Sequence, residues 1–163
     1  MTSSPSLPQS ALSKTLDAKL ISVNAEISSA KRLLEEMARL LTTGLDGAAR
    51  EKDIYHQLLE REKLGNTGIG NGVAVPHSRC DQATTAIVAI ISLKHPIDFD
   101  SIDKQEVDLA FGLLVPKEAS QEHLNLLADI ARLMSDPDKK HQLSMAKNQS
   151  EVIELIGSWS NTN

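Results

Sequence analysis

Aromatic residues are scarce in this chain of 163 residues, which has two Phe, one Trp and one Tyr. The core must therefore be aliphatic, and little material is available for stacking on bases or sugar rings. Lys and Arg are spread along the chain, which has a formal net charge of −5. A nucleic-acid-binding surface needs a basic patch. We therefore expect no nucleic acid among the partners.

Cysteine and long apolar runs are also lacking. The single cysteine, Cys80, excludes an internal disulfide and a thiolate metal cluster. The apolar run over 86–92 is far shorter than a membrane span, so no membrane insertion is expected. The Ser- and Pro-rich start has no signal-peptide pattern, which indicates a cytoplasmic protein. We expect residues 1–12 to be a flexible lead-in to one domain over 13–163.

Helical periodicity marks the two ends of the chain. One predicted helix covers 29–41, and its apolar stripe is Leu33, Leu34, Met37, Leu40 and Leu41. A second runs from about 51 to 63, with Gly65 as its C-terminal cap. Three more are expected after residue 120. Their predicted starts are an N-cap at Ser120, Asp136–Pro137, and an N-cap at Ser150. In the first of these three, the predicted apolar positions are Leu124, Leu127, Ala128, Ala131 and Met134.

Between these helices, β-branched runs predict strands over 73–75, 85–93 and 107–115. Lys94–His95–Pro96 is expected to form a turn. The order of helices, strands and helices predicts an α/β fold, a single-domain sandwich of a mixed β-sheet flanked by α-helices.

Half of the eight glycines lie within residues 65–72, at the start of the stretch GNTGIGNGVAVPHSR (65–79). The stretch lacks the Lys-Ser/Thr pair of a Walker A loop, and a strand rather than a helix follows it, unlike a dinucleotide-binding loop. Its glycines could gather N–H groups into an anion-binding concavity beside His77, which Pro76 presents rigidly. A tight turn with a surface histidine is the alternative, and spacing alone leaves both open.

Three motifs, in order, carry a family resemblance. Residues 59–77 read LEREKLGNTGIGNGVAVPH, residues 95–103 and 107–116 read HPIDFDSID and VDLAFGLLVP, and residues 123–131 read HLNLLADIA. Together they resemble phosphotransferase-system enzyme IIA domains of the fructose/mannitol type, and within that family most resemble the nitrogen-regulatory enzyme IIA. The resemblance covers roughly residues 15 to 157.

The resemblance implies that His77 is the phosphoryl acceptor, that Arg61 assists the phosphoryl group and that His123 is a second histidine beside it. Thr67, Gly68 and Gly70 are expected to bind phosphate, although the Thr67 hydroxyl could instead bond its own backbone. No cofactor and no metal ion are expected, since transfer between histidines does not demand Mg²⁺. His56, His95 and His141 are interpreted as surface residues.

The expected function is that of a phosphoryl carrier charged by an HPr-like phosphocarrier protein. Because no transport domain is fused to it, its phosphorylation state is expected to regulate protein targets. A sugar-specific enzyme IIA that passes phosphate to a separate enzyme IIB is the alternative. A third hypothesis is an interaction module that has kept the fold without the chemistry.

Overall fold

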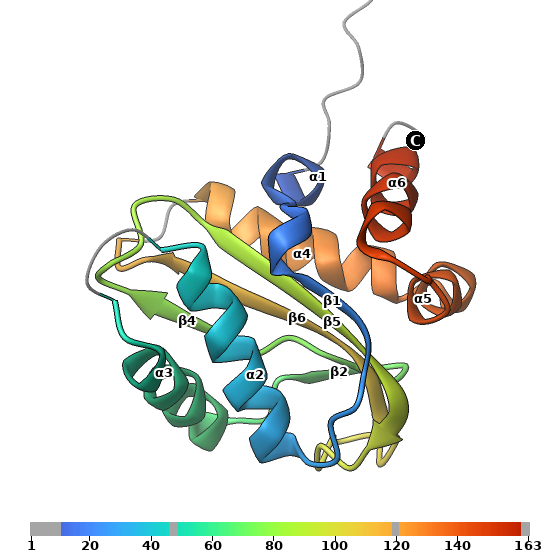
Figure 1. The fold of residues 1–163 in the computed structure, drawn as a ribbon, viewed down its shortest axis with the longest axis horizontal. Helices are drawn as coiled ribbons and strands as arrows, with labels where there is room; N and C mark the ends of the chain where they lie inside the picture. Colours follow the sequence, from blue (N-terminus) through green and yellow to red (C-terminus); the bar gives the residue numbers. More distant parts are fainter. Residues whose placement is uncertain (1–10, 46–48, 119–120, 161–163) are drawn as a thin grey trace, which may run out of the picture.

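The structure is a computed structural model that describes residues 11–45, 49–118 and 121–160. It has three layers, with a β-sheet between two sets of helices (Figure 1). Each face of the sheet carries its own buried aliphatic cluster. The predicted fold class is confirmed: a mixed, open sheet flanked by helices.

The sheet has six strands in the described part of the chain. Five of them follow the spatial order β1-β5-β6-β3-β2, and β4 pairs with β6. β5 and β6 are antiparallel, while β1 runs parallel to β5, and β3 and β4 run parallel to β6. The strand bounds are β1 Ile21–Ala25, β2 Gly68–Gly70, β3 Val73–Ala74, β4 His77–Cys80, β5 Ile87–Ile97 and β6 Val107–Pro116.

β3 and β4 occupy the same edge of β6. Ala74 lies beside Ala110, and His77 lies beside Leu113. The register therefore advances by the same number of residues on both sides of the pairing across the break. Pro76 falls in that break, where its missing N–H costs no ladder bond, and its carbonyl accepts a bond of 3.0 Å from the N–H of Leu113. The edge is therefore continuous, and His77 begins its second half.

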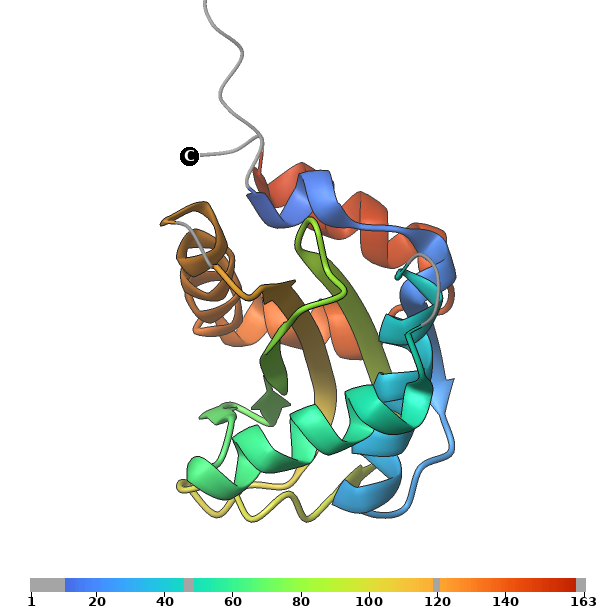
Figure 2. The same ribbon diagram turned by 90° about the vertical axis from the view of Figure 1, so that its left-hand side faces the viewer.

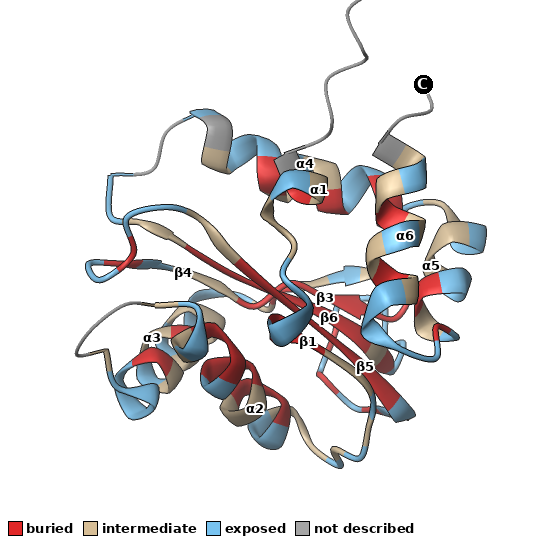
Figure 3. Ribbon diagram, turned by 45° about the horizontal axis from the view of Figure 1, so that its top comes forward, coloured by how far each residue is buried: buried red, intermediate tan, exposed pale blue. Residues whose placement is uncertain are grey.

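Two helices cover one face of the sheet and four cover the other (Figures 1 and 3). The first face carries α2 Ala30–Thr43 and α3 Glu51–Leu64. The second carries α1 Ala11–Thr15, α4 Gln121–Met134, α5 Pro137–Ser144 and α6 Gln149–Ser160, and the short 3₁₀ helix η1 Ala18–Leu20 leads into β1. None of the helices in the described ranges has both the length and the apolar character that crossing a bilayer requires.

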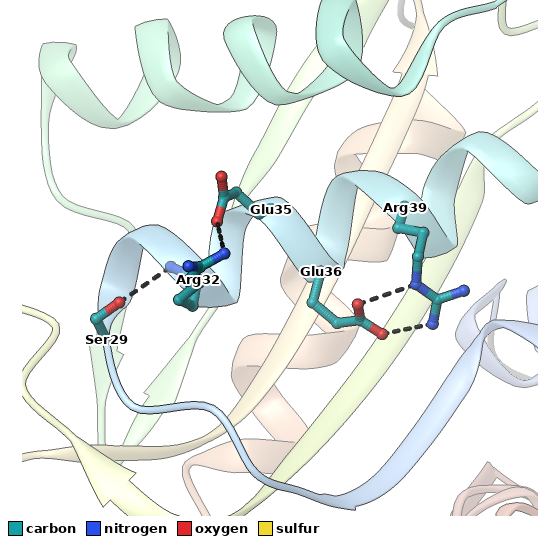
Figure 4. Close-up of polar contacts among 5 residues, drawn as sticks. All are labelled: Ser29, Arg32, Glu35, Glu36 and Arg39. Atoms are coloured by element: carbon teal, nitrogen blue, oxygen red, sulfur yellow. Dashed lines mark hydrogen bonds and ion pairs between the residues drawn. The ribbon is translucent and has the colours of Figure 1, made fainter.

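The α2 helix shows how local signals fix an element (Figure 4). The Ser29 hydroxyl accepts a hydrogen bond of 3.2 Å from the N–H of Arg32, which caps the first turn. Ion pairs Arg32–Glu35 and Arg39–Glu36 lie along its polar side. All five residues of its predicted apolar stripe are buried. The stripe packs on β6, where Gly112 leaves room for the side chain of Met37.

Several boundaries differ from the sequence-based prediction. Lys94, His95 and Pro96 are exposed but belong to β5, because the ladder resumes where Ile97 pairs with Val107 after an irregularity. A bulge of this kind tolerates a proline, which explains why the predicted turn is wrong. The strand β1 and the short strands β2 and β4 were not predicted.

The helix caps also test the predictions. Asp136 caps α5, as expected. The predicted cap Ser150 lies inside α6. The Asn148 side chain instead accepts a hydrogen bond of 2.9 Å from the N–H of Glu151. Asn and Ser are about equally good caps, so sequence alone does not separate them. The predicted cap Ser120 lies outside the described residues, as do residues 1–10 of the expected lead-in. Leu12, placed in that lead-in, is fully buried.

Candidate functional site

A cleft of about 610 Å³ lies at the edge of the sheet formed by β4, between α3 and α4. Figure 2 looks onto this edge, with α3 on one side of β4 and α4 on the other. Both helical layers and the sheet supply its lining: His56, Gln57, Glu60, Arg61 and Leu64 from α3, His77, Ser78 and Arg79 from β4, Leu113 and Val115 from β6, and His123, Leu124 and Leu127 from α4. A second hollow, of about 570 Å³ between α2 and α3, contains none of the predicted site residues.

His77 is the first residue of β4, and its ring is only partly buried. Its Nδ1 lies 2.7 Å from the carbonyl oxygen of Val75. A carbonyl can only accept, so Nδ1 carries the proton and donates it, and the lone pair lies on Nε2. The neutral ring therefore offers one defined nitrogen as a nucleophile.

The surroundings of His77 favour this neutral form. Burial lowers the pKa of His77 below its ordinary value of 6.5. The bond to Val75 and the negative charge of Glu62 raise the pKa, and the positive charge of Arg61 lowers it further, leaving a net decrease. At pH 7 most of the imidazole is therefore unprotonated and able to attack.

Arg61 lies in the last turn of α3, where its Nη1 donates a bond of 2.8 Å to the carbonyl of Gly65. A guanidinium has five N–H donors, so others are left for a ligand in the cleft. His123 is the third residue of α4 and reaches the cleft from the opposite helical layer. The structure thus brings the three predicted residues, His77, Arg61 and His123, into one cleft.

The other three predicted residues, Thr67, Gly68 and Gly70, do not line the cleft. The Thr67 hydroxyl donates to a Glu62 carboxylate oxygen at 2.6 Å, and not to its own backbone. The N–H groups of Thr67 and Gly68 are already bonded, to the side chain of Glu62 in α3 and to that of Asn66 in the loop. This geometry gives the proposed phosphate contacts no support, and they stay a prediction.

Arg79 is a cleft residue that the sequence analysis missed. It lies two residues after His77 on β4, and alternate residues of a strand face the same side. Its Nη1 donates a hydrogen bond of 3.3 Å to the carbonyl of Lys117, and its guanidinium adds positive charge to the cleft. The alternation could have identified it, had β4 been recognised as a strand.

The α4 helix departs from its predicted apolar stripe. Its buried residues are Leu126, Ile130, Leu133 and Met134, whereas Leu124 is 54% exposed. Leu124 and Leu127 line the cleft. Two overlapping stripes have helical spacing in this sequence, and contact with the sheet selects between them. The three histidines predicted to lie on the surface are all exposed: His56, His95 and His141. His56 also borders the cleft.

Comparisons with known proteins place this chain in a family. Residues 14–159 match the family described as "Phosphoenolpyruvate-dependent sugar phosphotransferase system, EIIA 2". The nitrogen regulatory protein of Pseudomonas aeruginosa is 40% identical over 134 residues, covering 82% of this chain and 86% of the relative.

Two solved structures share the fold. The nitrogen regulatory protein IIA-Ntr from Neisseria meningitidis superposes with a TM-score of 0.83 at 35% identity, covering 88% of this chain and 97% of that one. The mannitol IIA of Escherichia coli has a TM-score of 0.73 at 21% identity, covering 86% and 98%. The family match over nearly the whole chain, together with these likenesses, shows that the chain belongs to the EIIA type 2 family of the phosphotransferase system and is a phosphotransferase component.

Proposed function

We propose that this protein is a regulatory phosphoryl carrier in which His77 accepts phosphate from the phosphohistidine of an HPr-like carrier protein. The observation that carries the proposal is the meeting of His77, Arg61 and His123 in one cleft, with the proton of His77 held on Nδ1. The family match supports phosphoryl transfer as the chemistry.

In the transfer step, the Nε2 lone pair of His77 attacks the phosphorus atom of the donor's phosphohistidine. A P–N bond to Nε2 forms as the donor's P–N bond breaks, and the electron pair of the broken bond stays on the donor nitrogen. The Nδ1 proton remains on His77, where the carbonyl of Val75 accepts it. The ring thereby becomes a phosphoimidazolium, which is a reactive donor for the next transfer.

Positive charge around the cleft stabilises this step. Charge on the transferring group spreads over three equatorial oxygens, so positioning and electrostatics supply most of the catalysis. Arg61 offers a fork of donors to these oxygens, and His123 offers one more. The adjacent N-terminus of α4, a helix of 14 residues, adds positive potential. Arg79 supplements this field from the strand that carries the acceptor.

We propose that the phosphorylation state is the output of the protein, in nitrogen-related regulation. A phosphoryl group adds net negative charge and strong hydrogen-bond acceptors to one surface cleft, which is enough to change its contacts with protein targets. The regulatory assignment is supported by the identities, which are 40% and 35% to nitrogen regulatory proteins and 21% to a mannitol IIA.

The test combines the protein with phosphoenolpyruvate, enzyme I and the HPr-like carrier, and measures intact mass. We expect wild-type protein to gain one acid-labile phosphoryl group and His77→Ala to gain none. Phosphorylation of His77→Ala would overturn the assignment of the acceptor. Efficient transfer from the phosphorylated protein to an enzyme IIB domain would instead favour the sugar-specific alternative.

A further inference from the structure

Glu62 holds Thr67 with both of its carboxylate oxygens. The N–H of Thr67 donates to Oε2 at 2.8 Å, and the hydroxyl of Thr67 donates to Oε1 at 2.6 Å. Thr67 is 5% exposed, so these bonds are shielded from water at one end. Bonds to an ionised acceptor are among the strongest in proteins. Glu62 thus fixes the position of Thr67 relative to the end of α3.

The hydrogen bonds continue from Thr67 to the acceptor ring. The carbonyl of Thr67 accepts from the N–H of Val75 at 2.9 Å, and the carbonyl of Val75 accepts from Nδ1 of His77 at 2.7 Å. On the far side, the carbonyl of Pro76 accepts from the N–H of Leu113 at 3.0 Å. The Val75 carbonyl therefore lies between two fixed points of the backbone, one set by Thr67 and the other by β6.

We propose that Glu62 is a positioning residue for His77, which acts through Thr67 and Val75 to keep the ring proton on Nδ1 and the lone pair on Nε2. The inference rests on the proposed function only in its activity readout. A neutral imidazole without a fixed acceptor distributes its proton over both nitrogens. An Nε2 that carries the proton has no lone pair for phosphorus, so the fraction of competent rings falls.

Glu62 could instead act only through its negative charge, or only by stabilising the loop that follows α3. Three variants separate these roles. Glu62→Ala removes both hydrogen bonds and the charge. Glu62→Gln removes the charge but can keep both contacts, because its amide oxygen accepts the N–H of Thr67 and its NH₂ donates to the hydroxyl. Thr67→Val removes only the hydroxyl, and Glu51→Ala, an exposed position at the other end of α3, is the matched control.

The first measurement needs no phosphoryl donor. Long-range ¹H–¹⁵N NMR spectra of the histidine side chains, recorded above the pKa of His77, report which ring nitrogen carries the proton. We expect protonated Nδ1 in wild type, Glu62→Gln and Glu51→Ala. Glu62→Ala should show averaged nitrogen shifts typical of two tautomers, with Thr67→Val between. Backbone spectra check that each variant is folded, and if Glu62→Ala is not, the Thr67→Val and Glu62→Gln pair decides.

The second measurement is the rate of phosphorylation by the phosphorylated HPr-like carrier. Loss of an outer-shell partner of a metal-bound histidine costs about 10- to 100-fold in activity, and by analogy we expect kcat to fall about 10-fold in Glu62→Ala. KM for the donor should stay within about two-fold, since docking is unchanged, and Glu62→Gln should restore most of kcat.

A pure Nδ1–H tautomer and full kcat in Glu62→Ala or in Thr67→Val would overturn the inference. Absence of phosphorylation in wild type would instead overturn the proposed function, and the NMR comparison would still decide the role of Glu62.

Discussion

The Nδ1 atom of His77 lies 2.7 Å from the carbonyl oxygen of Val75, two residues earlier in the chain. One consequence is regiochemical: the phosphoryl group should be attached to Nε2. ³¹P–¹H and ¹⁵N NMR of the phosphorylated protein distinguish the two ring positions. Phosphate bound to Nδ1 would show that the bond to Val75 is broken before transfer.

A second prediction concerns the pKa of His77, which two substitutions should shift in opposite directions. Burial, the largest cause, lowers the pKa of His77 below 6.5, so the ring should titrate below 6.5. Its rate of phosphorylation should fall to half at that midpoint, as half of the rings become protonated. Arg61→Gln removes a positive neighbour and should raise the pKa of His77. Glu62→Gln removes a negative neighbour and should lower it.

NMR titration of the His77 ring protons in the three proteins measures these shifts. Shifts of the same sign in both variants, or a wild-type midpoint at or above 6.5, would contradict the electrostatic account of the site.

Apolar side chains at the mouth of the cleft predict where the donor protein docks. Leu64 is 86% exposed and Leu124 is 54% exposed, and both line the cleft. Exposed apolar residues around a polar centre are typical of a binding surface. In Leu64→Ala/Leu124→Ala, KM for the donor should rise about 10-fold, with kcat within about two-fold.

Ile102→Ala is the control for this prediction, since Ile102 is 84% exposed but does not line the cleft. Steady-state transfer from the phosphorylated carrier gives both constants. An equal effect of Ile102→Ala would show that general surface hydrophobicity, and not this cleft, recruits the donor.

A pair of glycine substitutions tests the packing of the sheet against α2. A Cβ at Gly112 would overlap the side chain of Met37, which is fully buried, so Gly112→Ala should destabilise the protein by about 1–3 kcal/mol. A Cβ at Gly157, in α6, meets nothing within 4 Å, so Gly157→Ala should stabilise it by about 0.5–1 kcal/mol. Urea denaturation gives both values, and equal effects would contradict the packing argument.

The long elements of this fold are predictable from periodicity. The apolar stripe of α2 is a helix signal, and the ten residues of β6 are apolar apart from Asp108. The short strands lack such a signal, because β4 consists of His-Ser-Arg-Cys and exists only by pairing with β6. This is why Arg79 was missed, although it lies two residues from His77.

Local sequence also cannot predict which of two equivalent arrangements forms when tertiary contacts decide between them. The apolar residues of α4 form two possible stripes, and the sheet buries Leu126 and Ile130 while leaving Leu124 to the cleft. Thr67 likewise has a hydroxyl suited to a phosphate or to its own turn. Its bond to Glu62 depends on how α3 ends, and no spacing rule states that in advance.

The shared edge of β6 has a consequence for the synthesis of the protein. The strands on either side of Pro76 cannot be aligned with each other until Val107–Pro116 has been made, because both pair with that one later strand. A nascent chain that stops short of this segment contains the imidazole but not the scaffold that orients it. We therefore expect the ability to receive phosphate to arise late in translation, together with completion of the sheet.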